Sequence, residues 1–211
     1  MKQKLSPRWA IIKLTGLFFA AYSAYNVFII FRDAPRGLSS EGILISALVA
    51  FMFALLAGYA LTFGVNKKKG LFLMIRKTSF IIALLTIFVL KLRMIDRIVM
   101  YMQPPDLYNG TPVYAVLYGI SYFLTLTGFL ILLVYYIFFR RRYLLFPRTA
   151  VSLPAAALGL FVCSLVLETI LFFGYGFMIE DNLLRTVVMR PVFYLGFIGL
   201  SAYFLYPPQL K

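Results

Sequence analysis

Residues 43–64 read ILISALVAFMFALLAGYALTFG, a stretch of 22 residues without one charged side chain. A helix of about 20 apolar residues is long enough to cross the hydrocarbon core of a bilayer. The stretch is continuously apolar and does not alternate with polar residues, so it predicts a helix and not a strand of a membrane barrel. This segment therefore predicts that the chain is embedded in a membrane.

Five further apolar segments share the character of residues 43–64. Hydrophobic residues make up 63% of the 211 residues and charged residues only 13%, which is more apolar surface than a soluble domain of this length can bury. We therefore predict an all-α integral membrane protein, a compact bundle of six transmembrane helices with short loops, in a single domain over residues 1–211. The predicted spans are roughly 9–31, 43–64, 78–102, 112–139, 150–177 and 187–206.

Basic residues without any acidic residue occupy both ends of the chain and two of its loops. These fourteen residues are Lys2, Lys4, Arg8, Lys13, Lys67, Lys68, Lys69, Arg76, Lys77, Arg140, Arg141, Arg142, Arg148 and Lys211. Because Lys and Arg stay on the cytoplasmic side, we expect both termini there, in contact with anionic lipids of the bilayer. The expected location is the cell membrane, specifically a prokaryotic inner membrane. Topology accounts for the net charge of +14, so no nucleic-acid binding is expected.

Several familiar kinds of chemistry are excluded by the residues that the chain lacks. It has no histidine, and its one cysteine, Cys163, lies within an apolar segment. Histidine-ligated haem, most zinc sites, histidine acid–base catalysis and intrachain disulfides are therefore excluded. The sequence also has no Gly-x-Ser-x-Gly or other recognisable catalytic motif. We expect no enzymatic activity, no metal site and no cofactor.

Charged residues inside the apolar segments are the candidates for function, because a charge in hydrocarbon normally faces the bundle interior or a water-filled space. In the third span, spacings of three and four place Arg93, Asp96 and Arg97 on one helical face, and Lys91 points roughly the other way. Counted along each helix at about 1.5 Å per residue, the polar residues of four spans fall at one depth in the outer half of the bundle. The other members of this layer are Asn26, Glu168 and Arg190, with Tyr22, Tyr25, Tyr118 and Tyr122 beside them.

Three interpretations of this layer remain open. Its acids pair with the arginines and lock the bundle, or the layer lines a pocket open to the outside, or it contacts lipid headgroups. Three arginines and two acids leave one positive charge, which an anionic ligand would neutralise. The predicted ligand-binding or pathway site consists of Arg93, Asp96, Arg97, Glu168, Arg190 and Asn26.

Small residues recur every four positions in the first two spans. They are Gly16, Ala20 and Ala24, and then Ala50, Ala54 and Gly58. Such spacings let helices approach closely in lipid. We expect these residues to pack within the chain, or to carry a partner subunit on the first helix or a second copy of this chain.

In general shape the chain resembles the substrate-binding subunits of energy-coupling-factor importers. The shared features are six helices, both ends inside, a site in the outer half, and small residues in the first helix, here Gly16, Ala20 and Ala24. The resemblance implies that active uptake would require partner subunits, since the sequence contains no ATP-binding motif. The predicted function is a small transporter, or a membrane-embedded solute-binding subunit, for an anionic or zwitterionic ligand. The alternatives are a non-catalytic assembly or sensor module whose buried charges lock the bundle, and an oligomeric channel.

Overall fold

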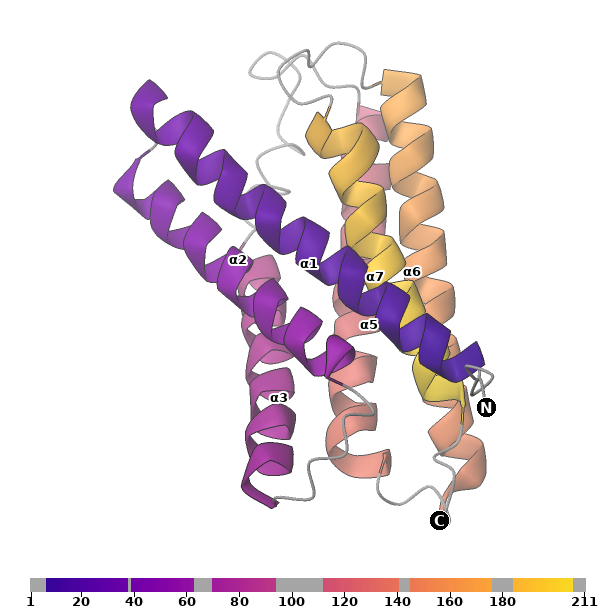
Figure 1. Cartoon of the computed structure of the whole chain (residues 1–211). Coiled ribbons are helices and arrows are strands. Elements are labelled where there is room, and N and C mark those ends of the chain that lie inside the picture. The colour runs from indigo at the N-terminus through magenta and orange to yellow at the C-terminus, as the bar shows by residue number, and fades with distance from the viewer. Residues whose placement is uncertain are drawn as a thin grey trace.

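The computed structural model of the chain is built from helices (Figure 1). The structure describes residues 7–37, 39–62, 70–93, 112–140, 145–175 and 184–206, and no strand occurs within these ranges. The α-helices are α1 (Pro7–Asp33), α2 (Ser40–Leu61), α3 (Gly70–Leu92), α5 (Pro112–Val134), α6 (Pro147–Tyr175) and α7 (Arg190–Leu205). Short segments flank them, namely the 3-10 turn η1 (Ala34–Arg36) and the π-helical segments η2 (Tyr135–Phe139) and η5 (Leu184–Met189).

Within the described part of the chain, five helical segments are long and apolar enough to cross a membrane. They correspond to the predicted spans 9–31, 43–64, 112–139, 150–177 and 187–206, and their ends lie within three residues of the predicted ones when η2 and η5 are counted with their helices. The prediction of a membrane protein with several spanning helices is therefore confirmed, and the apolar runs alone were sufficient to place these five.

The predicted span 78–102 is matched only in part. Helix α3 begins earlier, at Gly70, and ends at Leu92, with Arg93 in the turn that follows. Residues 94–111 lie outside the described part of the chain. The prediction started the span after Arg76 and Lys77 because these residues interrupt the apolar run. The helix continues through them, since a long basic side chain can bury its aliphatic stem while its charged end reaches toward water.

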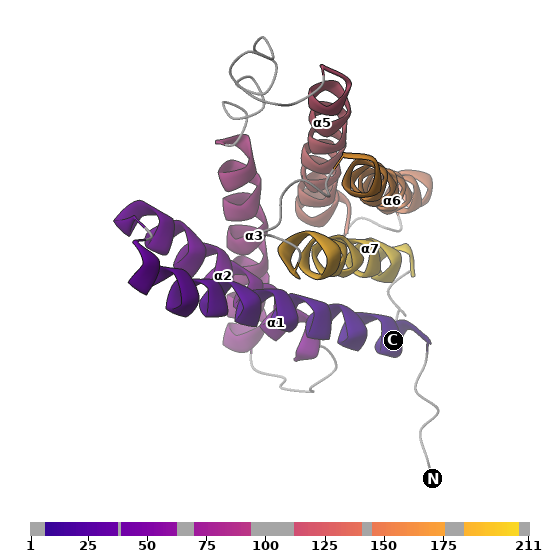
Figure 2. The same ribbon diagram turned by 90° about the horizontal axis from the view of Figure 1, so that it is seen from above.

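Helices α1 and α2 form an antiparallel pair that crosses the bundle obliquely, and α5, α6 and α7 pack side by side (Figure 1). Seen along the bundle in Figure 2, α3 lies between the α1–α2 pair and α5. The beginning of α1 and the end of α7 lie at the same end of the molecule (Figure 1), where the Arg8 guanidinium donates a hydrogen bond of 3.3 Å to the Tyr203 hydroxyl. We call this end the basic end.

A cluster of aromatic rings around Phe197 of α7 forms the centre of the core. Phe197 is fully buried, and its ring centroid lies 4.6 Å from that of Phe129, 5.1 Å from that of Phe19 and 5.4 Å from that of Phe161. These rings come from α5, α1 and α6, so a single residue of α7 joins four helices. Edge-to-face and tilted contacts of this kind stabilise beyond the apolar area that they bury.

The small residues predicted to mark packing faces do so only in part. Gly16 is buried, and a methyl group added there would lie 2.7 Å from a side-chain carbon of Leu61, so the glycine permits the close approach of α1 and α2. Ala20 is partly buried, and Ala50 is buried and accepts a hydrogen bond from Ser23 through its carbonyl oxygen. Packing within the chain is not found for three of the predicted residues, since α1 and α2 turn Ala24, Ala54 and Gly58 outward, where their side chains or Cα atoms are exposed.

The glycines that carry the tightest contact of α1 with α7 were not predicted. A Cβ atom added at Gly196 would lie 2.5 Å from the Phe19 ring, and one added at Gly199 would overlap the Thr15 hydroxyl. Phe19 is itself buried among the core rings and has little room to move. The absence of a side chain at these two positions is therefore what allows α1 to lie against α7.

We expect Gly196→Val to lower the free energy of unfolding by about 1–3 kcal/mol, because the added atoms overlap a ring that the core holds in place. The matched control is Gly58→Val, since nothing lies within 4 Å of a Cβ atom at Gly58. Thermal unfolding in one detergent, read for both variants beside the wild type, checks the prediction. Equal melting temperatures for the two variants would contradict it.

Candidate functional site

A cavity of about 550 Å³ lies at the end of the bundle opposite the basic end. Each of the six described α-helices contributes to its wall. Its charged and amide residues are Asn26, Arg32, Asp33, Glu41, Lys91, Arg93, Glu168 and Arg190, and its aromatic residues are Tyr22, Tyr25, Phe53, Tyr118, Phe193 and Tyr194. A space of this size fits a small organic solute.

The cavity brings together four of the six residues predicted from the sequence, namely Asn26, Arg93, Glu168 and Arg190. They come from α1, the turn after α3, α6 and α7, so residues of four distant segments line one cavity. The other two, Asp96 and Arg97, lie outside the described residues. Of the accompanying tyrosines, Tyr22, Tyr25 and Tyr118 line the cavity.

Lys91 also lines the cavity, whereas the helical spacing predicted that it points away from Arg93. Both residues stand at the very end of α3, where the Arg93 amide still donates to the Val89 carbonyl at 3.1 Å, and both of these long side chains line the one cavity. The Lys91 ammonium lies 5.2 Å from the centroid of the Phe193 ring and 5.6 Å from that of Tyr122. Ring faces attract a cation at such distances, and these contacts hold Lys91 on the cavity wall.

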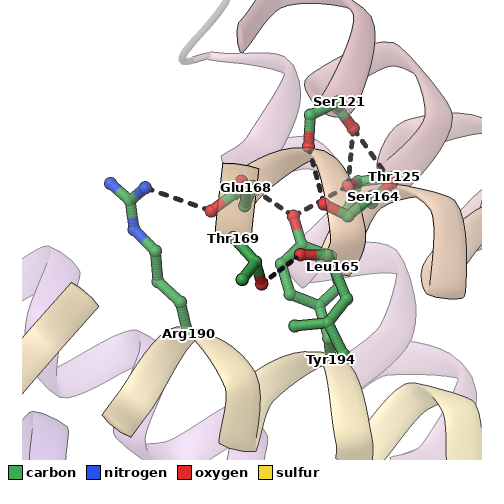
Figure 3. A network of polar contacts seen from close by, with 8 residues as sticks. All are labelled: Ser121, Thr125, Ser164, Leu165, Glu168, Thr169, Arg190 and Tyr194. Atoms are coloured by element: carbon green, nitrogen blue, oxygen red, sulfur yellow. Dashed lines mark hydrogen bonds and ion pairs between the residues drawn. The ribbon is translucent and has the colours of Figure 1, made fainter. Parts of the chain in front are cut away.

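Glu168 is the centre of a hydrogen-bonded network that joins α6 to α7 (Figure 3). The Arg190 guanidinium donates to one carboxylate oxygen at 3.1 Å, and the Tyr194 hydroxyl donates to the other at 2.9 Å. The side chain of Glu168 is only 12% exposed, whereas that of Arg190 is 36% exposed. Glu168 is therefore held within the wall, while Arg190 reaches from the wall into the cavity.

The network continues inward through hydroxyl groups that the sequence analysis did not identify (Figure 3). The Tyr194 hydroxyl lies 3.1 Å from the Thr125 hydroxyl, which donates to the Ser121 carbonyl at 2.8 Å. Ser121 and Ser164 each donate to the other's carbonyl oxygen, at 3.3 and 3.1 Å. These bonds connect α5 with α6 and α7 in a region where the four hydroxyl-bearing residues are buried.

The spacing of polar residues in the sequence is consistent with the network around Glu168. Ser121 and Thr125, Ser164 and Glu168, and Arg190 and Tyr194 each stand four positions apart, which places both members of a pair on one helical face. Hydroxyl groups are common in membrane helices, so the spacing gains meaning only when the facing helix is known.

The local backbone explains why Arg190 stands at the cavity wall. The π-helical segment η5 ends at Met189, and α7 begins at Arg190 with Pro191 in its first turn. Proline has no backbone N–H, so it cannot continue the hydrogen bonds of a preceding helix and commonly stands where a new one starts. The wider π turn before it changes the direction of the side chains.

A tight turn between α1 and α2 supplies the rim of the cavity. Gly37 adopts a left-handed backbone with φ of 90°, and Ser39 caps α2 by accepting a hydrogen bond from the Gly42 amide at 3.1 Å. Glu41, in the first turn of α2, lines the same cavity as the ion pair of the chain neighbours Arg32 and Asp33, whose charged atoms are 2.6 Å apart.

The charges of the cavity wall nearly balance. The described lining residues include four basic side chains, Arg32, Lys91, Arg93 and Arg190, and three acidic ones, Asp33, Glu41 and Glu168. One positive charge is left over. Asn26 adds a polar group but uses its amide nitrogen to donate to the Tyr22 carbonyl of its own helix at 2.8 Å.

This arrangement can hold a small polar molecule between groups of opposite charge and aromatic rings. Within the described residues, no group of three Cys, Asp or Glu side chains is placed to hold a metal ion. The chain matches no protein-family model, no curated protein and no solved structure, so its function has to be argued from the site itself.

Proposed function

We propose that this chain is a membrane-embedded transporter or solute-binding subunit that takes a small anionic or zwitterionic solute into the cavity. The observation that supports the proposal best is that Arg93, exposed at the end of α3, and Arg190, which reaches in from α7, share one cavity with Lys91. Guanidinium groups bind carboxylate and phosphate groups well because their planar donors match these acceptors.

The acids of the wall favour a zwitterion over a simple anion. Asp33 and Glu41 lie on the α1–α2 side, and Arg93 lies on the α3 side. A solute with a cationic and an anionic end can satisfy both sides at once. The aromatic rings between them, including Tyr22 and Phe193, provide apolar contact for the middle of such a molecule.

The second candidate is a module without a solute, in which the buried charges lock the bundle. The network around Glu168 favours it, because Arg190 and Tyr194 of α7 both donate to Glu168 of α6 and the Tyr194 hydroxyl lies 3.1 Å from that of Thr125 on α5. The two candidate functions depend on different residues, since locking the bundle uses Glu168 and its partners and solute binding uses Arg93.

The third alternative, an oligomeric channel, is supported by none of the described contacts. Ion flux through liposomes that contain the chain would be evidence for it.

We also propose that the cavity faces the outside and the basic end faces the cytoplasm. Lys13, Arg76, Lys77, Arg140 and Arg148 belong to helix segments at the basic end, and the described carboxylates line the cavity at the other end. An impermeant thiol reagent added to whole cells should label a cysteine at the exposed Ser40 and not one at Arg148, in a Cys163→Ser background. The reverse pattern would refute this orientation.

The proposed function is tested by thermal unfolding of the purified chain with one amino acid, one dicarboxylate, one phosphate ester and one amine, each at about 1 mM. We expect the zwitterionic or anionic compounds to raise the melting temperature, because a ligand that binds only the folded state stabilises it. Arg93→Gln should abolish the rise, and the control Arg148→Gln, exposed and remote from the cavity, should keep it. A rise that is equal in both variants, or produced only by the amine, would refute the proposal.

A further inference from the structure

Glu168 differs in its surroundings from the other acids of the described chain. Asp33 is the last residue of α1 and Glu41 stands in the first turn of α2, whereas Glu168 lies within the apolar span of α6. Its side chain is 12% exposed, and it lines the cavity. An ionised carboxylate in such a place is costly unless a positive charge and hydrogen-bond donors meet it.

The Glu168 carboxylate is held ionised by its contact with Arg190. Within the described ranges, its ion pair is with Arg190 and its second donor is the neutral hydroxyl of Tyr194, at 3.1 and 2.9 Å (Figure 3). Both donors stand on α7. The other helix that packs against α6 is α5, which presents the uncharged hydroxyl groups of Ser121 and Thr125. The negative charge of Glu168 is therefore compensated by contact with one residue, Arg190.

The remaining charged or titratable groups of the cavity form neither a hydrogen bond nor an ion pair with Glu168 in the part of the chain that the structure describes. They are Arg32, Asp33, Glu41, Lys91 and Arg93, with the hydroxyl groups of Tyr22, Tyr25 and Tyr118. Three of these side chains are basic and two are acidic, so their effects on Glu168 across the cavity oppose one another.

Arg190 is placed to serve two partners. One of its nitrogens donates to one oxygen of Glu168 at 3.1 Å, and its side chain is 36% exposed at the cavity wall. A guanidinium can also hold a carboxylate or a phosphate through two parallel hydrogen bonds, which is a stronger arrangement than a single one. The anionic group of a solute in the cavity can therefore compete with Glu168 for Arg190.

We propose that Glu168 is a proton-binding site that is coupled to solute binding, an inference that rests on the proposed function. When the anionic group of the solute takes the Arg190 guanidinium, the Glu168 carboxylate loses its ion-pair partner. It then binds one proton, which arrives through the cavity that Glu168 lines. The new O–H bond makes Glu168 neutral, and its other oxygen still accepts from the Tyr194 hydroxyl.

The charges balance in this step. The described wall carries one positive charge in excess. A solute with one negative charge and one proton together add no net charge, so the wall and its contents keep the same charge after binding. The solute therefore enters the site together with a proton, and acid conditions favour its binding.

Arg190→Gln reproduces the loss of the ion pair without any solute. Infrared spectroscopy of the full chain, titrated with pH, detects the C=O stretch of a protonated carboxyl group. We expect Glu168 in Arg190→Gln to bind its proton at least about tenfold more tightly than in the wild type, because the carboxylate has lost its positive neighbour. Adding Glu168→Gln to this variant should remove the band, which assigns it to Glu168.

The matched control for the infrared titration is Arg32→Gln. It removes one positive charge from the same cavity, but from a residue that pairs with Asp33 and not with Glu168. Proton binding by Glu168 should change less than about threefold in this control, since the charge acts only across the cavity. A Glu168 that titrates alike in Arg190→Gln and Arg32→Gln would overturn the proposal.

A second measurement needs no variant at Arg190 and so holds even if Arg190→Gln does not fold. Isothermal titration of the wild type with glutamate and with succinate, in two buffers that differ in their heat of ionisation, counts the protons taken up for each solute bound. We expect about one proton per bound solute at neutral pH, and an affinity that rises up to about tenfold for each unit by which the pH falls. Glu168→Gln should bind without this uptake, and Glu41→Gln should keep it.

Failure of the proton site is distinguishable from failure of the proposed function. Binding of a probe without proton uptake by the wild type, or with the same uptake by Glu168→Gln, would overturn the proton site and leave solute binding intact. Absence of binding by both probes would count against the proposed function, and the coupling would fall with it.

Discussion

Replacing Glu168 by alanine should lower the free energy of unfolding by about 3 kcal/mol, the largest stability effect that we expect for a single polar residue of this chain. The change leaves the Arg190 guanidinium and the Tyr194 hydroxyl without the carboxylate that now accepts from both. Breaking a buried ion pair costs about 3–5 kcal/mol, and the lower end applies because the 36% exposure of Arg190 lets water screen its charge.

A double variant at the same ion pair should lose much less stability. In Glu168→Met with Arg190→Met, apolar side chains replace both charged partners, so neither charge of the pair is left without the other. The control for the single variant is Glu41→Ala, which removes an exposed acid of the same cavity and should cost less than about 0.5 kcal/mol. Unfolding in a denaturing detergent measures all three variants. A Glu168→Ala chain as stable as Glu41→Ala would show that the network does not stabilise the bundle.

Reversing the charge of Arg93 should weaken binding of an anionic solute at least about a hundredfold. The described wall has four basic and three acidic side chains, and Arg93→Glu changes this balance to three basic and four acidic. The variant removes one charge-assisted contact and adds repulsion of a negative solute. Stability should change little, because the Arg93 side chain is exposed.

The comparison that isolates the charge is between Arg93→Glu and Arg93→Gln, measured by isothermal titration with whichever compound stabilises the wild type. We expect Arg93→Gln to lie between the wild type and Arg93→Glu. Loss of affinity that is the same for both variants would point to lost contact area and not to charge. If Arg93→Glu binds the solute as tightly as the wild type does, Arg93 does not contact the solute.

The positions of most helices were predictable from the sequence because a helix that spans a membrane requires a long apolar run. Residues 43–64 carry no charge, and helix α2 follows them within three residues. Helix α3 was misplaced because Arg76 and Lys77 are ambiguous in sequence: a basic residue can end a span or belong to it with its charged end turned toward water. Which of the two occurs depends on neighbours, here the Tyr59 ring near Arg76.

The sequence indicated the depth in the bundle at which polar residues of different helices lie, but not which of these residues contact one another. Glu168 and Arg190 stand at matching depth in antiparallel helices, and the structure joins them by a bond of 3.1 Å. The partners Tyr194 and Thr125 were missed because their contacts depend on which helix faces which, and a single sequence does not contain that information. The same holds for Gly196, whose importance appears only when Phe19 is placed beside it.

The central proposal is that the cavity holds an anionic or zwitterionic solute. Its most direct test is native mass spectrometry of the wild type and Arg93→Glu, purified from membranes and then exposed to the four solute classes. We predict that the wild type retains or takes up one small molecule that carries a negative group, and that Arg93→Glu does not. A wild-type chain that binds none of these solutes, or binds them as Arg93→Glu does, would contradict the proposal.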